Sequence, residues 1–379
     1  MLVPRYGSGA LSDVVPSLLA GLDVPGMVNT LSLPAARKVC LLLVDGLGWE
    51  LLQRYAADAP FLAGLAGGSI TAGFPATTGT SLAAIGTGVP SGEHGVVGYT
   101  FAAAPDQLIN VLRWTSHASG KHVDLRDRFV PEEFQPLPTT FERAQEAGVL
   151  VRLVTEAAFE GSGLTRAVLR GGEFAGVLAL GDLAAKAATA LTAADRVFCY
   201  AYHSQLDLLG HVYGPGSAAW RFQLGHVDRL AAAIASDLPP DAMLVVTADH
   251  GMVLVGKDDK ADFDTTPELQ DGVRMLAGEP RVRHIYVEDN ALDDVLTTWR
   301  AHLGDRAQVV PREEAIEAGW FGPRVLDRVR ARIGDIVVAT TGTAVVVRSG
   351  VEPMFTQMAG QHGSLTATEQ LIPLLTLTS

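Results

Sequence analysis

The sequence of 379 residues is poor in cysteine, in basic side chains and in long apolar runs. Its two cysteines, Cys40 and Cys199, lie in apolar, strand-like stretches with no metal-site spacing, so we expect buried, reduced thiols, with a disulfide as the alternative. With 29 basic and 42 acidic residues the net charge is −13, which argues against a groove for a nucleic-acid polymer. A small anionic substrate is not excluded, because bound divalent cations reverse the charge locally.

The sequence also shows neither the pattern of a membrane-spanning segment nor that of a targeting segment. No apolar run reaches the roughly 18 residues of a membrane span. The first residues lack the charged start and unbroken apolar segment of a signal peptide. We therefore expect a cytoplasmic protein without a membrane span. The hydrophobic content of 48% predicts a globular enzyme with a large core, and the composition does not indicate the oligomeric state.

Continuous apolar runs predict strands that are covered on both faces. These runs span residues 38–44, 148–155, 196–202 and 242–247, with helical patterns over 182–191 and 218–235 between them. Strands that alternate with helices predict an α/β fold, here an α/β/α sandwich with a mostly parallel central sheet. In such sheets the functional site lies beyond the carboxyl ends of the strands.

The composition changes after residue 255, where an acidic loop leads into a helix near 292–303 and a strand pair near 335–347. We predict a catalytic domain of residues 1–255 and 348–379 and a smaller inserted subdomain of residues 256–347. Whether this subdomain covers the site as a lid is not predicted. The chain is expected to close with a helix over 366–375.

Acidic and imidazole side chains follow several of these strands or stand in glycine-containing turns. They are Asp45, Asp207, His211, Asp249, His250 and His362. Asp207 and His211 are four residues apart, which places both on one face of a helical turn. Three carboxylates and three imidazoles suit a pair of divalent cations, with zinc favoured and manganese as the alternative. For any one of them alone, helix capping or a structural hydrogen bond is the commoner role.

A stretch of small residues over 73–88, GFPATTGTSLAAIGTG, suits a helix pressed closely against a sheet. Thr78 would stand at or near the start of this helix, where unpaired N–H groups and the positive end of the helix dipole favour a phosphate. Its hydroxyl is therefore a candidate nucleophile, with helix capping as the alternative. For Thr77, a role as a second cap or a loop hydroxyl is favoured.

In their order along the chain, these residues resemble the alkaline phosphatase superfamily, and within it the nucleotide pyrophosphatase/phosphodiesterase branch. The motifs that carry the resemblance are VDGLGW at 44–49, Thr78 ten residues before Gly88, DLLGHVYGP at 207–215, TADHGM at 247–252 and GQHG at 360–363. The resemblance spans residues 40 to 363, which is most of the chain.

The resemblance implies a two-metal site. One ion would be bound by Asp45, Asp249, His250 and the Thr78 hydroxyl, and the other by Asp207, His211 and His362. It also implies that Thr78 attacks phosphorus to form a phospho-threonine intermediate, which water then hydrolyses.

Two aromatic residues bear on the substrate. Tyr202 stands five residues before Asp207, like a tyrosine that lines the phosphate pocket in this branch. The branch also has an asparagine 21 residues beyond the nucleophile, where this chain has Tyr99. This departure puts standard nucleotide recognition in doubt, although a phenol can donate a hydrogen bond in its place.

We expect a metal-dependent hydrolase of small phosphate esters, with phosphodiester or pyrophosphate bonds favoured. The alternatives are a phosphomonoesterase, a phosphonate hydrolase on the same metals and an isomerase of the phosphoglycerate mutase type. A phosphomonoesterase needs a further cation or an arginine for the terminal dianion, and Arg113, Arg126 and Arg128 are candidates that the sequence does not place.

Overall fold

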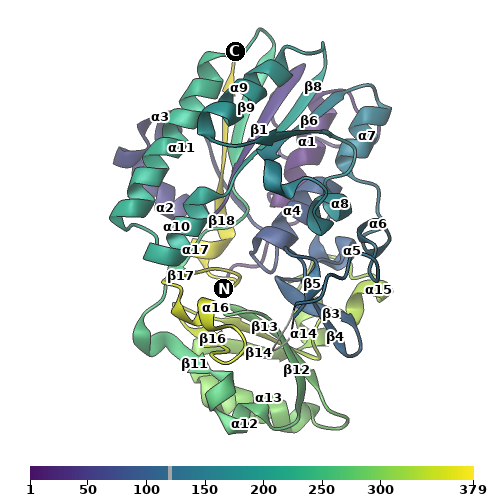
Figure 1. Ribbon diagram of the computed structural model, residues 1–379, viewed down its shortest axis with the longest axis vertical. Helices are drawn as coiled ribbons and strands as arrows, with labels where there is room; N and C mark the ends of the chain where they lie inside the picture. Colours follow the sequence, from purple (N-terminus) through teal and green to yellow (C-terminus); the bar gives the residue numbers. More distant parts are fainter. Residues whose placement is uncertain (118–121) are drawn as a thin grey trace.

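The computed structural model describes residues 1–117 and 122–379. Its largest sheet has seven strands in the order β2-β18-β9-β1-β8-β6-β7 (Figure 1). These strands are β1 (Lys38–Val44), β2 (Ala66–Thr71), β6 (Leu150–Glu156), β7 (Glu173–Val177), β8 (Val197–His203), β9 (Ala242–Thr247) and β18 (Leu371–Thr378). β1 is parallel to β8 and β9, and β6 is parallel to β7 and β8, whereas β18 is antiparallel to both neighbours. The predicted α/β fold with a mostly parallel sheet is confirmed.

Helices lie on both faces of this sheet (Figure 1). One layer contains α2 (Trp49–Arg54), α3 (Pro60–Gly64), α9 (Leu180–Leu191), α10 (Gln205–Tyr213) and α11 (Ala218–Ser236), and the other contains α1 (Val14–Gly21), α4 (Thr78–Thr87), α7 (Thr140–Glu146) and α8 (Gly163–Val168). Because both faces are covered, β8 and β9 are buried at every position, which explains their continuous apolar sequence. Cys40 and Cys199 are register partners on β1 and β8, and both are free thiols.

The predicted closing helix over 366–375 is wrong. Only Ala367–Gln370 form a short helix, α17, and the following residues form β18 between β2 and β9. A short apolar run fits a buried strand as well as a helix, so periodicity alone did not separate the two. Pro373 decides against the helix, because proline lacks the N–H that a helix interior requires.

A second sheet lies in the lower half of Figure 1 and has the strand order β12-β13-β15-β14. Its elements are β12 (Val273–Glu279), β13 (Val282–Val287), β14 (Ala307–Pro311) and β15 (Ile336–Thr340), with the helices α12 (Pro267–Gln270) and α13 (Leu292–Leu303) beside them. Leu276, Ile285 and Trp299 belong to an apolar cluster separate from the main core. This sheet and its helices fall within the proposed insertion, whose bounds stay a prediction.

Two strands are present near 335–347, as predicted, but they do not pair with each other. β15 pairs with β13 and β14, whereas β16 (Val345–Val347) pairs with β11 (Lys260–Asp262). A third sheet follows α4 and its strands are β3 (Thr100–Ala104), β4 (Gln107–Asn110) and β5 (Thr115–Ser116). It touches the inserted sheet, because the Thr100 hydroxyl donates to the Gly278 carbonyl at 2.9 Å.

Further short helices and strands lie along the described chain. They are α5 (Ser91–His94), α6 (Pro131–Phe134), β10 (Val253–Leu254), α14 (Arg312–Glu317), α15 (Asp327–Arg330), α16 (Pro353–Gln357) and β17 (Gly360–Gln361). Within the described residues, none of the helices combines the length and the apolarity needed to cross a bilayer.

Candidate active site

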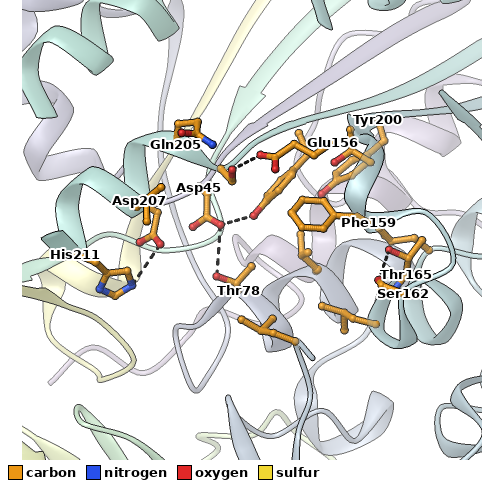
Figure 2. A pocket seen from close by; sticks show the side chains of 18 residues that line it. Asp45, Thr78, Glu156, Phe159, Ser162, Thr165, Tyr200, Gln205, Asp207 and His211 are labelled. Atoms are coloured by element: carbon orange, nitrogen blue, oxygen red, sulfur yellow. Dashed lines mark hydrogen bonds and ion pairs between the residues drawn. The ribbon is translucent and has the colours of Figure 1, made fainter. Parts of the chain in front are cut away.

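The three acidic residues of the predicted set lie at one edge of the central sheet. Asp45 directly follows β1, Asp249 stands two residues beyond β9, and Asp207 is in the first turn of α10, which follows β8. Because β8, β1 and β9 are adjacent and parallel, their carboxyl ends meet at the same place. Figure 2 shows Asp45 and Asp207 there beside Thr78 and His211.

A first group of donor atoms surrounds the Thr78 hydroxyl. Its oxygen lies 3.5 Å from Asp45 Oδ2 and 3.4 Å from His250 Nε2. His250 Nε2 is in turn 3.4 Å from Asp45 Oδ1 and 3.4 Å from Asp249 Oδ2. The structure therefore brings together the four residues proposed for one ion.

A second group contains Asp207, His211 and His362. His211 Nε2 lies 3.3 Å from Asp207 Oδ2 and 3.2 Å from His362 Nε2, and His362 Nε2 is 3.8 Å from Asp207 Oδ1. One donor atom from each of these residues lies within 4.8 Å of the others, and the same holds for Asp45, Asp207 and His250. Asp207 thus stands between the two groups, as a paired-ion site requires.

Each imidazole is held by a backbone carbonyl on the side away from the site. The Nδ1 atoms of His211, His250 and His362 lie 2.8 Å from Gly360 O, 3.0 Å from Gly251 O and 2.9 Å from Ala76 O. A carbonyl only accepts, so each Nδ1 carries the proton and donates. The Nε2 lone pairs then face the site, which is the usual orientation of histidine ligands to a metal.

Each of the three carboxylates has one oxygen atom for which the described residues offer no hydrogen-bond partner. These buried atoms are Asp45 Oδ1, Asp207 Oδ1 and Asp249 Oδ2. Burial raises the pKa of Asp45 well above its usual value and also raises that of Asp207, and the neighbouring carboxylates act in the same direction. Buried anionic oxygens of this kind need cations, so this donor set fits a pair of divalent ions.

Thr78 is the first residue of α4, and Thr77 is the residue that precedes it as N-cap. Thr77 makes no side-chain capping hydrogen bond, so the first of its two expected roles, a second cap, is wrong, and the role of a loop hydroxyl stays a prediction. Ser81, one turn into α4, donates to the Asp249 carbonyl at 2.8 Å and ties the helix to the metal-ligand turn. The small residues of α4 allow it to approach α8 closely, and not only the sheet. At Gly86, an added Cβ would lie 1.6 Å from Val168 O in α8.

The two aromatic candidates take different positions. The Tyr202 hydroxyl donates a short hydrogen bond to Asp45 Oδ2 and thereby orients a candidate ligand. Burial and the charge of Asp45 raise the pKa of Tyr202 well above its usual value, so it stays a donor. The Tyr99 hydroxyl accepts from Asn110 Nδ2, and both Tyr99 and Thr78 line one cavity.

Two cavities open on Thr78 and share Leu112, Asp207 and His211. The first, of about 360 Å³, is the pocket of Figure 2. Its further lining includes Leu82, Phe159, Leu164, Leu169 and Tyr202. The second, of about 220 Å³, is lined by Thr77, Tyr99, Arg113, Glu279, Met354, Phe355, Met358, Gln361 and His362. A phosphate ester at Thr78 thus has room for a substituent on either side.

Glu279 was not among the residues expected from the sequence. It is the last residue of β12 in the inserted sheet, and its side chain reaches the second cavity. Burial raises its pKa to about 8, against the effect of the Thr77 hydroxyl and of Arg283. A single glutamate between glycine and proline has no sequence signal for such a position, because only the tertiary fold brings it beside Thr77.

Paired acid and imidazole groups, at the carboxyl edge of a mostly parallel sheet and beside a helix-starting threonine, define a phosphate-ester hydrolase of the alkaline phosphatase type. The family model for type I phosphodiesterase / nucleotide pyrophosphatase matches residues 39–365, and the chain belongs to this family. The protein is therefore a phosphodiesterase-like hydrolase.

Solved structures agree on the fold. Murine ectonucleotide pyrophosphatase / phosphodiesterase 5 aligns with a TM-score of 0.67 and 19% identity, over 89% of this chain and 87% of that chain. An inactive threonine-to-alanine variant of the murine protein in complex with AMP, and the human protein, give the same TM-score and coverage at 18% identity. At these identities the likeness shows the fold alone. No curated protein matches the sequence.

Proposed function

We propose that the protein hydrolyses phosphodiester or pyrophosphate bonds in small molecules by attack of the Thr78 hydroxyl on phosphorus. The observation that carries this is the position of Thr78 Oγ1, within 3.5 Å of both Asp45 and His250. Family membership supports the bond type. The metal dependence and the threonine intermediate are part of the proposal.

Two divalent ions are assigned to the two donor groups. Asp45, Asp249, His250 and Thr78 would hold one, and Asp207, His211 and His362 the other. When bound, such ions lower the pKa of a coordinated hydroxyl and neutralise phosphate charge. Mixed carboxylate and imidazole ligands suit zinc, and manganese is the alternative.

The chain's own residues supply orientation. Tyr202 holds Asp45, and the backbone carbonyls hold the three imidazoles, so the donor atoms are fixed before substrate binds. Thr78 stands in the first turn of α4, whose unpaired N–H groups favour the phosphate oxygens. The Thr78 oxygen forms a bond to phosphorus as the bond to one alcohol breaks, and water then hydrolyses the phospho-threonine.

A monoesterase needs a positive side chain against the terminal dianion. Of the three arginines considered, Arg126 pairs with Asp124 and Arg128 contacts Gln107, whereas Arg113 lines the second cavity. Only one of the three arginines lines a cavity, and both cavities have room for a substituent, which favours a diester over a monoester. Free thiols at Cys40 and Cys199 support the further proposal that the protein works in the reducing cytoplasm.

A panel of esters tests the proposal in the presence of zinc or manganese. It contains bis-p-nitrophenyl phosphate, p-nitrophenyl thymidine monophosphate, p-nitrophenyl phosphate and a p-nitrophenyl phosphonate. We expect kcat/KM to be highest for one of the two phosphodiesters. A higher kcat/KM for p-nitrophenyl phosphate or for the phosphonate would contradict the proposed bond type. Interconversion of phosphoglycerates without release of phosphate would show that the protein is an isomerase.

A further inference from the structure

The hairpin of β12 and β13 carries the inserted sheet to the active site and is fixed there by two buried ion pairs. Arg281 Nη2 lies 2.7 Å from Oε2 of Glu369 in α17, and both side chains are fully buried. Arg283 Nη2 lies 2.7 Å from Glu352 Oε2, just before α16. Burial would raise the pKa of Glu352, but Arg283 and His117 outweigh it and hold that pKa at about 2.

Glu279 is a further buried ionisable residue of this hairpin, and among the described residues it has no basic partner within hydrogen-bond distance. Glu279 is 3% exposed, and its Oε1 atom has no hydrogen-bond partner among these residues. The side chain packs against Gly363, where an added Cβ would lie 3.1 Å from Glu279 Cγ. The carboxyl group thus lies between the turn that carries His362 and the start of α4.

The second cavity, which Glu279 lines, lies on the side where a leaving group departs. In an in-line displacement the leaving alcohol departs opposite the attacking Thr78 oxygen. Thr78 contacts Asp45 and His250 of the first donor group, so the leaving side is assigned to the second group, Asp207, His211 and His362. Asp207 and His211 line both cavities, and His362 lines only the second, together with Glu279.

We propose that Glu279 determines specificity by binding a hydroxyl group of the leaving alcohol, so that the preferred substrates are diesters whose leaving group is a polyol or sugar. This inference rests on the proposed function of the site. A carboxyl group that lines a cavity pairs well with a neutral hydroxyl, which both donates and accepts.

Charged leaving groups fit this cavity less well. Arg113 also lines it and disfavours a cation, whereas the carboxylate of Glu279 would repel an anion such as the phosphate released from a pyrophosphate. Thr77, Tyr99 and Gln361 add further hydrogen-bonding groups around the same space.

Three esters of thymidine 5′-monophosphate test the proposal, with p-nitrophenol, 1-propanol and glycerol as leaving groups. The propyl and glyceryl esters have the same chain length and differ only in hydroxyl groups. Release of the nucleotide is followed by chromatography. For the wild-type enzyme we expect kcat/KM to favour the glyceryl over the propyl ester by about tenfold, the effect of one well-placed hydrogen bond.

Glu279→Ala should bring this ratio close to one, whereas Glu288→Ala, which removes an exposed carboxylate of the same subdomain, should keep it. If Glu279→Ala fails to fold, Glu279→Asp withdraws the carboxyl from the cavity by one methylene and should also lower the ratio. In a Thr78→Ala background, calorimetry should show the same preference in Kd, and its loss on substitution of Glu279.

If Glu279→Ala lowered kcat/KM equally for all three esters, the inference would be overturned. Glu279 would then only support Thr77 and the start of α4. A wild-type preference for the propyl ester, or for an ester with a cationic or a phosphate leaving group, would overturn it as well. The proposed function is tested separately: absence of any p-nitrophenol release from wild type would refute that function, while the binding comparison would still decide the role of Glu279.

Discussion

The imidazole ring of His250 lies flat on that of His362, with ring centroids 3.5 Å apart and ring planes 12° apart. The two rings belong to different donor groups, so this stack joins the two proposed ion sites. Two protonated rings would repel each other at this distance. Burial, together with His250 and His211, lowers the pKa of His362 well below its usual value. The neutral ring that results is the form that binds a divalent metal.

Removal of one of these rings should remove one ion. We expect the wild-type protein to contain about two equivalents of divalent metal and His362→Ala about one, with turnover reduced by on the order of a thousandfold. His302→Ala, which alters an exposed histidine of α13, is the control and should retain both ions. Elemental analysis by mass spectrometry after desalting measures the content. Two equivalents in His362→Ala would contradict the assignment of this residue as a ligand.

Loss of the nucleophile should separate chemistry from metal binding. Thr78→Ala deletes the hydroxyl beside Asp45 and His250 but none of the carboxylates or imidazoles. We expect kcat for the preferred diester to fall by at least about a thousandfold while the metal content stays near wild type. Thr77→Ala is the matched comparison, because it removes the neighbouring hydroxyl and should cost far less. Comparable activity of Thr78→Ala and wild type would show that another group attacks phosphorus.

The sequence was most informative where the local pattern had one interpretation. The runs at 38–44 and 242–247 are β1 and β9 with the predicted bounds, because a nearly continuous apolar run is typical of a strand covered on both faces. The acid and imidazole residues beyond these strands could be proposed as neighbours, since parallel strands end at a common edge. Their distances and the carbonyls that orient them come from the structure.

The sequence was least informative where the answer depends on tertiary contacts. The run that forms β18 is short, and its strand identity comes from the open edge of β9 beside it. Glu279 reaches the site because Arg281 and Arg283 form buried ion pairs with acids that are 88 and 69 residues away in the sequence. No local pattern encodes such a pairing.

Metal removal should destabilise the protein more at high pH than at low pH. The pKa values of Asp45 and Asp207 are raised in the folded, metal-free chain above the unfolded value of 3.8. Stability from such groups is fully present below that unfolded value and is lost as the pH rises through the folded values. We therefore expect the difference in Tm between metal-loaded and chelator-treated protein to widen from about pH 5 to about pH 8.

Differential scanning fluorimetry across this range measures that difference. Asp207→Asn removes one of the buried charges, so at about pH 8 it should stabilise the chelator-treated protein while weakening the stabilisation by metal. Stability curves that run parallel with and without chelator would contradict the proposed coupling between the carboxylates and the ions.

The placement of Thr78 depends on how closely α4 approaches α8. At Gly86 an added Cβ would lie 1.6 Å from Val168 O and 2.8 Å from Val168 C, and backbone atoms cannot move aside as a flexible side chain can. Gly86→Ala should therefore lower the free energy of unfolding by about 3 kcal/mol or more and lower kcat through displacement of α4. Gly181→Ala in α9 is the control: nothing lies within 4 Å of its added Cβ, and alanine there should stabilise the helix by about 0.5–1 kcal/mol. Urea unfolding followed by circular dichroism compares the two variants. Equal stabilities would mean that α4 can shift away from α8 at little cost, and the position of Thr78 would then have to be fixed by Ser81 and the metal-ligand turn instead.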